Sequence, residues 1–259
     1  MEEFTPITTQ EQLDKVIGER IAGVKAKYEG FDDYKQKAED YDALKQRTEQ
    51  ELEETESRLE VLCGQLSEMR KAAAKELTAK IKAGLTDLNF IDVEFSMEFT
   101  RLSHFTAGGF DEAEFMISTN PGESVKPLGM VASGGELSRI MLAIKTVLAD
   151  TDDIPTLIFD EIDTGISGRT AQMVSEKLSY IAKNHQVICI THLPQIAAMA
   201  DAHYEIAKTA ADGRTTTTIR PLAADEMVDE LARLLGGAKI TEAVRENARE
   251  MKRLAGERK

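Results

Sequence analysis

The first third of the chain carries its apolar residues at helical spacing. Residues 9–85 contain no proline and are highly charged. Within them, apolar side chains follow the alternating three- and four-residue steps of a coiled coil, at Leu52, Leu59, Leu62, Leu66 and Met69. This spacing predicts a long helix whose narrow apolar seam needs a partner helix.

The start of this helical region has its own signals. Thr8–Glu11 has the residue types of a helix N-cap, and Gly30 predicts a break before the long helix. The seam is weak over residues 34–50, where the large apolar residues are Tyr34, Tyr41 and Leu44. A solvated helix and a dimer-dependent helix both fit that stretch.

From residue 90 the pattern changes to that of strands. Apolar side chains alternate with polar ones, at Ile91, Val93, Phe95, Met97 and Phe99. A turn at Gly108–Gly109 and a second run at 114–118 predict a hairpin. This strand has one wet face, so its apolar side chains are expected to point inward.

Beyond the hairpin, helix and strand patterns alternate. Helices are predicted at 135–149 and 168–183, and strands at 156–160 and 186–191. The alternation indicates a parallel sheet with helices against it, which is an α/β fold. The chain is then predicted to end in a second hairpin and two helices, at 203–208 and 215–220 (joined by Asp212–Gly213), 224–235 and 240–255.

Composition narrows the class of protein. The 259 residues carry a net charge of −14, so no general basic field draws the chain to nucleic acid or to an anionic membrane. No apolar run reaches the ~18 residues of a membrane span, and the acidic N-terminus is unlike a signal peptide. Cys63 and Cys189 form no C-x-x-C pair, which favours free thiols in a reducing compartment. A cytoplasmic protein is expected.

Ser133-Gly134-Gly135-Glu136 opens the first helix of the α/β part. Ser-x-x-Glu before an apolar-periodic run is a capping box, and an ordinary capped helix is one interpretation. The glycine pair favours another, because it lets a ligand approach backbone amides at the positive end of a helix dipole. Phosphate groups bind well in that environment.

Two adjacent carboxylates follow the strand at 156–160. The run Leu157–Phe159 is continuously apolar, which predicts a central strand buried on both faces. Ligands of such sheets lie beyond the carboxyl ends of the strands, where Asp160 and Glu161 fall. Asp160 is a candidate Mg²⁺ ligand, and Glu161 is a candidate to orient or deprotonate an attacking water. A surface acidic turn is the alternative.

The next strand ends at His192, with Leu193-Pro194 placed to begin a helix. A lone histidine at a strand end is more often structural than catalytic, but its place after the Asp-Glu strand favours a shared phosphate. The sequence contains no G-x-x-x-x-G-K-[ST] loop, which holds the phosphates in P-loop proteins. The motifs are those of half an ATPase.

Together these motifs resemble the C-terminal half of the RecN family, SMC-like members of the ABC ATPase superfamily. The resemblance covers about residues 59–254 and is densest over 120–139, 159–171 and 191–197. It implies an ABC-ATPase C-terminal lobe, a mostly parallel sheet flanked by helices, preceded by a long coiled-coil-type helix.

The resemblance implies that the start of the 135–149 helix binds nucleotide. Ser133, Gly134 and Gly135 match the signature motif that contacts the γ-phosphate of ATP held by a second head. Glu136 belongs to the same nucleotide-binding set. The implied cofactors are ATP and Mg²⁺.

The resemblance also assigns roles to the two strand ends. Asp160 looks like the Walker B aspartate that serves Mg²⁺, and Glu161 like the catalytic glutamate. Asp163 looks like the D-loop aspartate, which acts across the head–head interface. His192 looks like the switch histidine that senses the γ-phosphate.

The implied function is ATP hydrolysis in DNA double-strand break repair and recombination, by a chain that is inactive alone because the P-loop lobe is missing. The implied partners are that N-terminal lobe or a second head, DNA, and a further copy of the chain through the coiled coil. A nucleoid-associated cytoplasmic protein without a membrane partner is expected. DNA binding through the last helix is less favoured than a solvated face, because glutamates interleave with its basic residues.

We expect three parts: a helical segment of residues 1–50, a coiled-coil arm of residues 51–86 and the ABC-like lobe of residues 87–259. Residues 1–50 depart from the family and faintly resemble the N-terminal part of phage capsid scaffolding proteins, which are helical and self-associating. The alternative function is therefore a self-assembling helical protein that carries an inactive ABC-like lobe.

Overall fold

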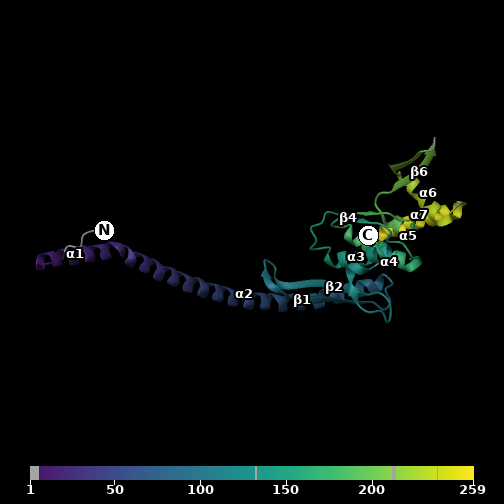
Figure 1. The fold of residues 1–259 in the computed structure, drawn as a ribbon. Coiled ribbons are helices and arrows are strands. Elements are labelled where there is room, and N and C mark those ends of the chain that lie inside the picture. The colour runs from purple at the N-terminus through teal and green to yellow at the C-terminus, as the bar shows by residue number, and fades with distance from the viewer. Residues whose placement is uncertain (1–5, 132, 212–213, 238) are drawn as a thin grey trace. The chain divides into compact units, whose positions relative to one another are not determined.

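The chain forms two compact units, Met1–Gln65 and Leu66–Lys259. The structure is a computed structural model that describes residues 6–131, 133–211, 214–237 and 239–259 (Figure 1). The long helix α2 contributes residues to both units. The predicted boundaries at residues 50 and 86 remain predictions.

The first unit consists of helix α1 (Gln10–Lys27) and most of helix α2 (Phe31–Asp87). The predicted cap is confirmed, because the Thr9 hydroxyl accepts a hydrogen bond from the Gln12 amide at 3.3 Å. The predicted break is also confirmed at Gly30, whose φ of +88° is a left-handed conformation that glycine adopts readily.

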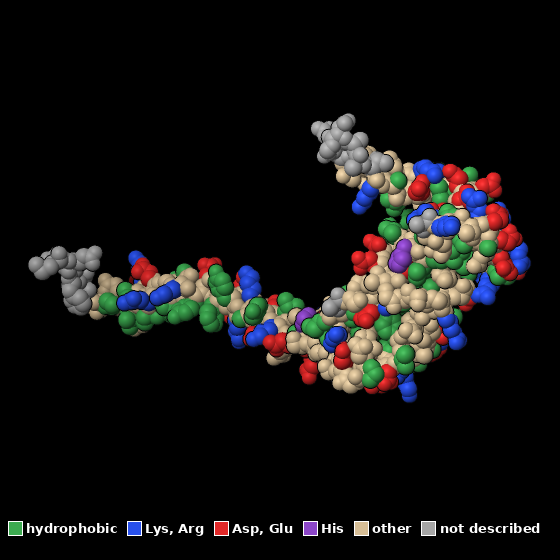
Figure 2. Space-filling model, turned by 90° about the vertical axis from the view of Figure 1, so that its right-hand side faces the viewer, with side chains coloured by type: hydrophobic (Ala, Val, Ile, Leu, Met, Phe, Trp, Pro, Cys, Tyr) green, Lys and Arg blue, Asp and Glu red, His purple; other side chains and the backbone are tan. Residues whose placement is uncertain are grey.

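The first unit has almost no core of its own. Of its described residues only Cys63 is buried, and the apolar side chains of α1 are exposed. Figure 2 shows hydrophobic side chains gathered along one side of this helical segment. The predicted seam of α2 is likewise present and uncovered. Ion pairs between residues four apart, such as Lys37–Asp33, contribute only about 0.2–0.5 kcal/mol each to such a helix.

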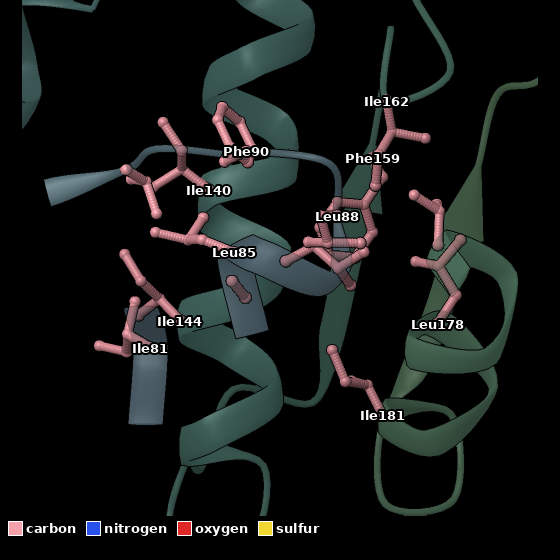
Figure 3. Close-up of a cluster of buried hydrophobic side chains, with 14 of the residues drawn as sticks. Ile81, Leu85, Leu88, Phe90, Ile140, Ile144, Phe159, Ile162, Leu178 and Ile181 are labelled. Carbon is pink, nitrogen blue, oxygen red and sulfur yellow. The ribbon is translucent and has the colours of Figure 1, made fainter. Parts of the chain in front are cut away.

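The last turns of α2 lie in the core of the second unit. Ile81 and Leu85 of α2, and Leu88 directly after it, are at most 1% exposed. Figure 3 shows them converging with side chains from α3, β4 and α4. They belong to one cluster of buried side chains that also includes Phe90, Ile140, Ile144, Phe159, Ile162, Leu178 and Ile181. The coiled-coil-type helix is thus anchored by its C-terminal end.

The predicted first hairpin is confirmed as an antiparallel sheet of β1 (Glu94–Thr106), β2 (Gly109–Ser118) and β3 (Lys126–Pro127). Within the second unit, the Ser67 hydroxyl of α2 donates to Asp111 of β2 at 3.0 Å. The inward position predicted for Ile91 is wrong, since this side chain is 85% exposed. The chain is still turning at residues 91–92, so the strand alternation begins only after them.

The predicted alternation of helices and strands is confirmed. After the short 3₁₀ helix η1 (Leu128–Met130) come α3 (Gly134–Leu148), β4 (Thr156–Phe159), α4 (Gly168–Ile181), β5 (Gln186–Cys189) and α5 (Pro194–Met199). Strands β4 and β5 are parallel, with Phe159 paired to Cys189. A mixed helix and sheet unit preceded by a long helix is the predicted α/β class.

The prediction that β4 is buried on both faces is wrong. Phe159 on one face is 5% exposed, but Ile158 on the other is 68% exposed. Ile188, its register partner on β5, and Ile190, just after β5, are 45% and 48% exposed. A continuous apolar run is typical of a strand that is buried on both faces. In the part of the chain that the structure describes, however, only one face of β4 is covered.

The chain ends with the antiparallel hairpin β6 (Tyr204–Ala211) and β7 (Arg214–Pro221) and the helices α6 (Ala224–Gly236) and α7 (Glu242–Glu257), all close to their predicted bounds. The turn predicted at Asp212–Gly213 lies outside the described residues. α5, α6 and α7 share a small second core. No helix among the described residues is long and apolar enough to cross a membrane.

Leu85→Ala should lower the free energy of unfolding by about 2–5 kcal/mol, because it opens a cavity where α2 enters the core. Denaturant titration of the full chain measures this change. The control is Val61→Ala on the same helix. Val61 is 58% exposed and lies outside the seam, so its effect should stay within about 0.5 kcal/mol. Equal effects of the two changes would contradict the anchoring of α2.

Candidate functional site

Ser133 is the N-cap of α3, and its hydroxyl accepts a hydrogen bond from the Glu136 amide at 3.4 Å. Among the described residues this is the only half of the predicted capping box that forms. The Glu136 carboxylate instead lies near Arg139, one turn further along the helix, where its charge favours the guanidinium cation. The helix therefore begins where predicted, with the serine alone as its side-chain cap.

The first turns of α3 pack tightly on the loop that follows β4. The Ser138 hydroxyl donates to the Asp160 carbonyl at 2.8 Å, and Arg139 donates to the Thr164 carbonyl at 2.8 Å. A β-carbon on Gly135 would stand 2.9 Å from the Thr164 β-carbon and 3.0 Å from the Glu161 carbonyl oxygen. The glycine is thus required for close packing between helix and loop.

Arg139 is a site residue that the motifs did not single out. Its side chain lies over the Phe90 ring, and the residue is only 8% exposed. Burial lowers the pKa of the guanidinium, while the charge of Glu136 opposes this effect. Its signal in the sequence is its position one turn after Gly135 and three residues before Leu142, inside the buried stripe of an amphipathic helix.

Asp160 and Glu161 follow β4 at its carboxyl end, as predicted. Glu161 has a φ of +56°, which is uncommon for a residue with a side chain and is typical of functional sites. The Asp160 carboxylate accepts a hydrogen bond from the Glu161 amide at 2.9 Å. The Glu161 carboxylate points to the start of α3, since a β-carbon on Gly134 would lie 2.7 Å from its Oε2. The positive end of the helix dipole favours a carboxylate there.

Asp163 joins the loop after β4 to the loop after β5. One of its oxygens, Oδ2, accepts hydrogen bonds from the Thr191 hydroxyl at 2.6 Å and from the His192 amide at 2.8 Å. The same oxygen lies 3.0 Å from the His192 Nδ1. The Asp163 side chain is 5% exposed, whereas that of His192 is 71% exposed.

The structure therefore brings the predicted site residues to one edge of the β4–β5 sheet. Gly134 and Gly135, directly after the cap Ser133, meet the loop of Asp160 and Glu161, and Asp163 links that loop to His192. His185 lies at the opposite end of β5, with its ring nitrogens 2.7 and 3.0 Å from the Ile154 and Ala149 carbonyl oxygens. These hydrogen bonds raise the pKa of His185. It is a packing residue away from the site.

The glycine pair should respond unequally to alanine. Gly135→Ala is expected to cost about 1–3 kcal/mol of stability, because backbone and a β-carbon must move to make room. Gly134→Ala meets only the mobile end of Glu161, so its stability should change by less than about 1 kcal/mol. Thermal and denaturant unfolding of both variants measures the difference. A larger loss for Gly134→Ala would contradict the packing described here.

Cys189 should be an unreactive thiol. Burial raises its pKa to about 12, and the nearby charges of Asp163 and Asp160 add to the effect. At pH 8 its alkylation should be about a thousandfold slower in the native chain than in the denatured chain, because the thiolate is the reactive form. Since the folded pKa lies above the value of 9.0 for an ordinary thiol, the stability that the neutral thiol contributes is present below pH 9 and lost as pH rises toward 12. Mass spectrometry of peptides after timed alkylation measures the rate, and fast native labelling would contradict the prediction.

Known proteins match most of this chain in sequence. The chain is 46% identical over 218 residues to the DNA repair protein RecN of Halalkalibacterium halodurans, covering 83% of this chain and 38% of the relative. It is 37% identical over 262 residues to the DNA repair protein RecN of Bacillus subtilis, covering 95% of this chain and 46% of the relative. No family model matches the sequence.

A solved structure of the Smc head domain of Pyrococcus yayanosii, with a coiled coil and joint, aligns with a TM-score of 0.47 and 22% identity. It covers 87% of this chain and 43% of that chain. The Bacillus alignment leaves 5% of this chain, about 13 residues, unmatched, so it includes most of residues 1–50. The chain spans less than half the length of the two RecN relatives. The resemblance to the RecN family is thus confirmed, and the chain is consistent with a C-terminal fragment of a RecN protein.

Proposed function

We propose that this chain is the C-terminal lobe of a RecN-like ATPase head and takes part in ATP-dependent repair of DNA double-strand breaks. The observation that carries the proposal is the meeting of three elements at one sheet edge. The start of α3 lies against the Glu161 carboxylate after β4, and Asp163 of the same loop lies against His192 after β5. A phosphate group bound at the strand ends would face carboxylates and an imidazole of this chain, while the adjacent start of α3 would serve the phosphate held by a second head.

The chemistry of each group fits phosphoryl transfer to water. Ser133, Gly134 and Gly135 present the amide end of α3 to an incoming phosphate. Glu161 is placed to orient or deprotonate the attacking water, and the exposed ring of His192 to contact the γ-phosphate. In such reactions positioning and electrostatic stabilisation supply most of the catalysis.

Asp160 fits Mg²⁺ only as a single carboxylate ligand. Among the described residues no group of three or more His, Cys, Asp or Glu side chains is arranged to hold a metal ion. Mg²⁺ in nucleotide sites is commonly held by one or two carboxylates together with substrate phosphates and water. When bound, the ion would neutralise charge on the phosphates. We therefore propose that Asp160 contacts the ion of an ATP·Mg²⁺ complex, directly or through water, once phosphates are present.

The bare face of β4 and β5 supports completion of this site by a P-loop lobe. Ile158 and Ile188 are register partners on that face, and the exposed Ile190 follows directly after β5. Parallel sheets are almost always covered on both faces and built from more than two strands. A lobe that covers these isoleucines and extends the sheet would also bring the missing phosphate loop to the strand ends.

We propose that the exposed seam of α2 pairs with a second helix, either the other arm of the same coil or a further copy of the chain. DNA contact through α7 has little support. The basic side chains of α7 and the two basic residues that follow it all contact acidic groups or carbonyl oxygens. They are Arg245, Arg249, Lys252 and Arg253 on the helix, and Arg258 and Lys259 after it. We therefore assign the DNA partner to another surface of the completed protein, in the cytoplasm at the nucleoid.

The self-assembling scaffold alternative is not favoured. RecN relatives match 83% and 95% of this chain, and the longer match includes most of the segment that faintly resembles a scaffolding protein. The exposed stripe of α1 is shared by both interpretations, because an amphipathic helix needs a partner in either case. The alternative gives the assembled edge of the α/β unit no role, whereas the ATPase proposal gives it one.

The test is to mix the full chain with a separately produced P-loop half of a RecN protein and to measure ATP hydrolysis. The chain alone should show almost no turnover, and the mixture should show clear turnover. Glu161→Gln should lower kcat by about a hundredfold or more while nucleotide still binds. Glu114→Gln, an exposed glutamate on β2, is the matched control and should leave kcat unchanged. Strong turnover by the chain alone, or an active Glu161→Gln mixture, would overturn the proposal.

A further inference from the structure

The Asp163 carboxylate is engaged within its own chain. Its Oδ2 accepts hydrogen bonds from the Thr191 hydroxyl at 2.6 Å and from the His192 amide at 2.8 Å, and it lies 3.0 Å from the His192 Nδ1. Hydrogen bonds to an ionised carboxylate are the stronger kind. The two hydrogen bonds hold the loop after β5 to the loop after β4, and the third approach brings the His192 ring against the same oxygen.

These contacts define the proton state of one ring nitrogen of His192. At 3.0 Å from a carboxylate oxygen, Nδ1 is favoured as the protonated nitrogen, because a carboxylate accepts hydrogen bonds and would repel a lone pair there. In the neutral ring Nε2 is then the acceptor, and in the charged ring it is a donor. The hydrogen bond made by one imidazole nitrogen thus fixes what the other nitrogen offers. Because the side chain is 71% exposed, Nε2 is the nitrogen available to a ligand.

Thr191 completes the arrangement from the other side. Its hydroxyl donates to Asp163 and accepts a hydrogen bond from the Leu193 amide at 3.0 Å. The loop after β5 is therefore held at three successive residues just before α5 begins. This fixes the backbone from which the His192 ring approaches Asp163.

Asp163 is mostly buried within its own chain. Its side chain is 5% exposed, and Oδ2 already accepts hydrogen bonds from the Thr191 hydroxyl and the His192 amide. If a second molecule took over Oδ2, both of these donors would lose their acceptor.

We propose that Asp163 is a positioning residue that acts within its own chain, by holding His192 with Nδ1 protonated and Nε2 directed to the phosphate. This inference rests on the proposed ATPase function and differs from the interface role implied by the family resemblance. Asp163 touches neither phosphate nor water in this assignment. It works through His192, and Thr191 supports it.

The first experiment reads the His192 tautomer in the full chain without nucleotide. Long-range ¹H–¹⁵N spectra of the ¹⁵N-labelled protein distinguish the two tautomers, and His192→Gln identifies the His192 signals among those of the four histidines. The wild-type ring should show the proton on Nδ1. Asp163→Ala should abolish that preference, whereas Asp163→Asn should keep it, because the amide oxygen still offers an acceptor at the same place. Thr191→Val should also keep it.

A wild-type ring with its proton on Nε2, or an unchanged spectrum in Asp163→Ala, would overturn the inference. The wild-type result decides the matter by itself if the alanine variant does not fold. This arm needs neither ATP nor a P-loop half, so it does not depend on the proposed function.

The second experiment is a double-mutant cycle in the complemented head. Asp163→Ala and His192→Gln should each lower kcat by about a hundredfold, and the double variant should lose no more than His192→Gln alone. Losses that multiply would show that Asp163 acts independently of His192 and would overturn the inference. If the wild-type mixture shows no turnover, the proposed ATPase function fails, while the spectra still decide the role of Asp163.

Discussion

The contact between the first turns of α3 and the loop after β4 is the constraint on which the site depends. Gly135 has no room for a side chain between Thr164 and the Glu161 carbonyl. Ser138 and Arg139 then bond the carbonyls of Asp160 and Thr164. Because consecutive turns of one helix hold both ends of the loop, the helix start and the acidic loop behave as one rigid piece.

Much of this arrangement follows from sequence pattern. Parallel strands joined by a helix place their carboxyl ends at the same edge, so residues after the runs at 157–159 and 187–189 had to meet. Ser133 precedes an apolar-periodic run and caps it, as expected. The Gly30 break and the Thr9 cap are local signals, and local signals transfer well from sequence to structure.

Other features depend on what surrounds a residue, which one sequence does not report. Periodicity shows that Ile158 is apolar but not whether another layer covers it. Arg139 is a charged residue in a buried stripe, and its carbonyl partners come from a loop 23–25 residues away. The family motif implied that Asp163 acts across an interface, which requires an exposed side chain. In the structure the residues that follow β5 lie against this carboxylate, and its side chain is 5% exposed. Glu136 had two possible partners, the cap and Arg139, and spacing alone favoured the wrong one.

The uncovered isoleucines on β4 and β5 bear on how the molecule survives in solution. Both strands are edges in the described sheet, so their backbone groups are open to pairing along a bare apolar surface. Open edges of this kind are templates for aggregation between chains. The acidic net charge of −14 opposes such encounters through mutual repulsion. The time for which the isolated chain stays monomeric therefore depends on the balance between edge-to-edge aggregation and charge repulsion. A partner that covers the exposed isoleucines would remove the aggregation risk.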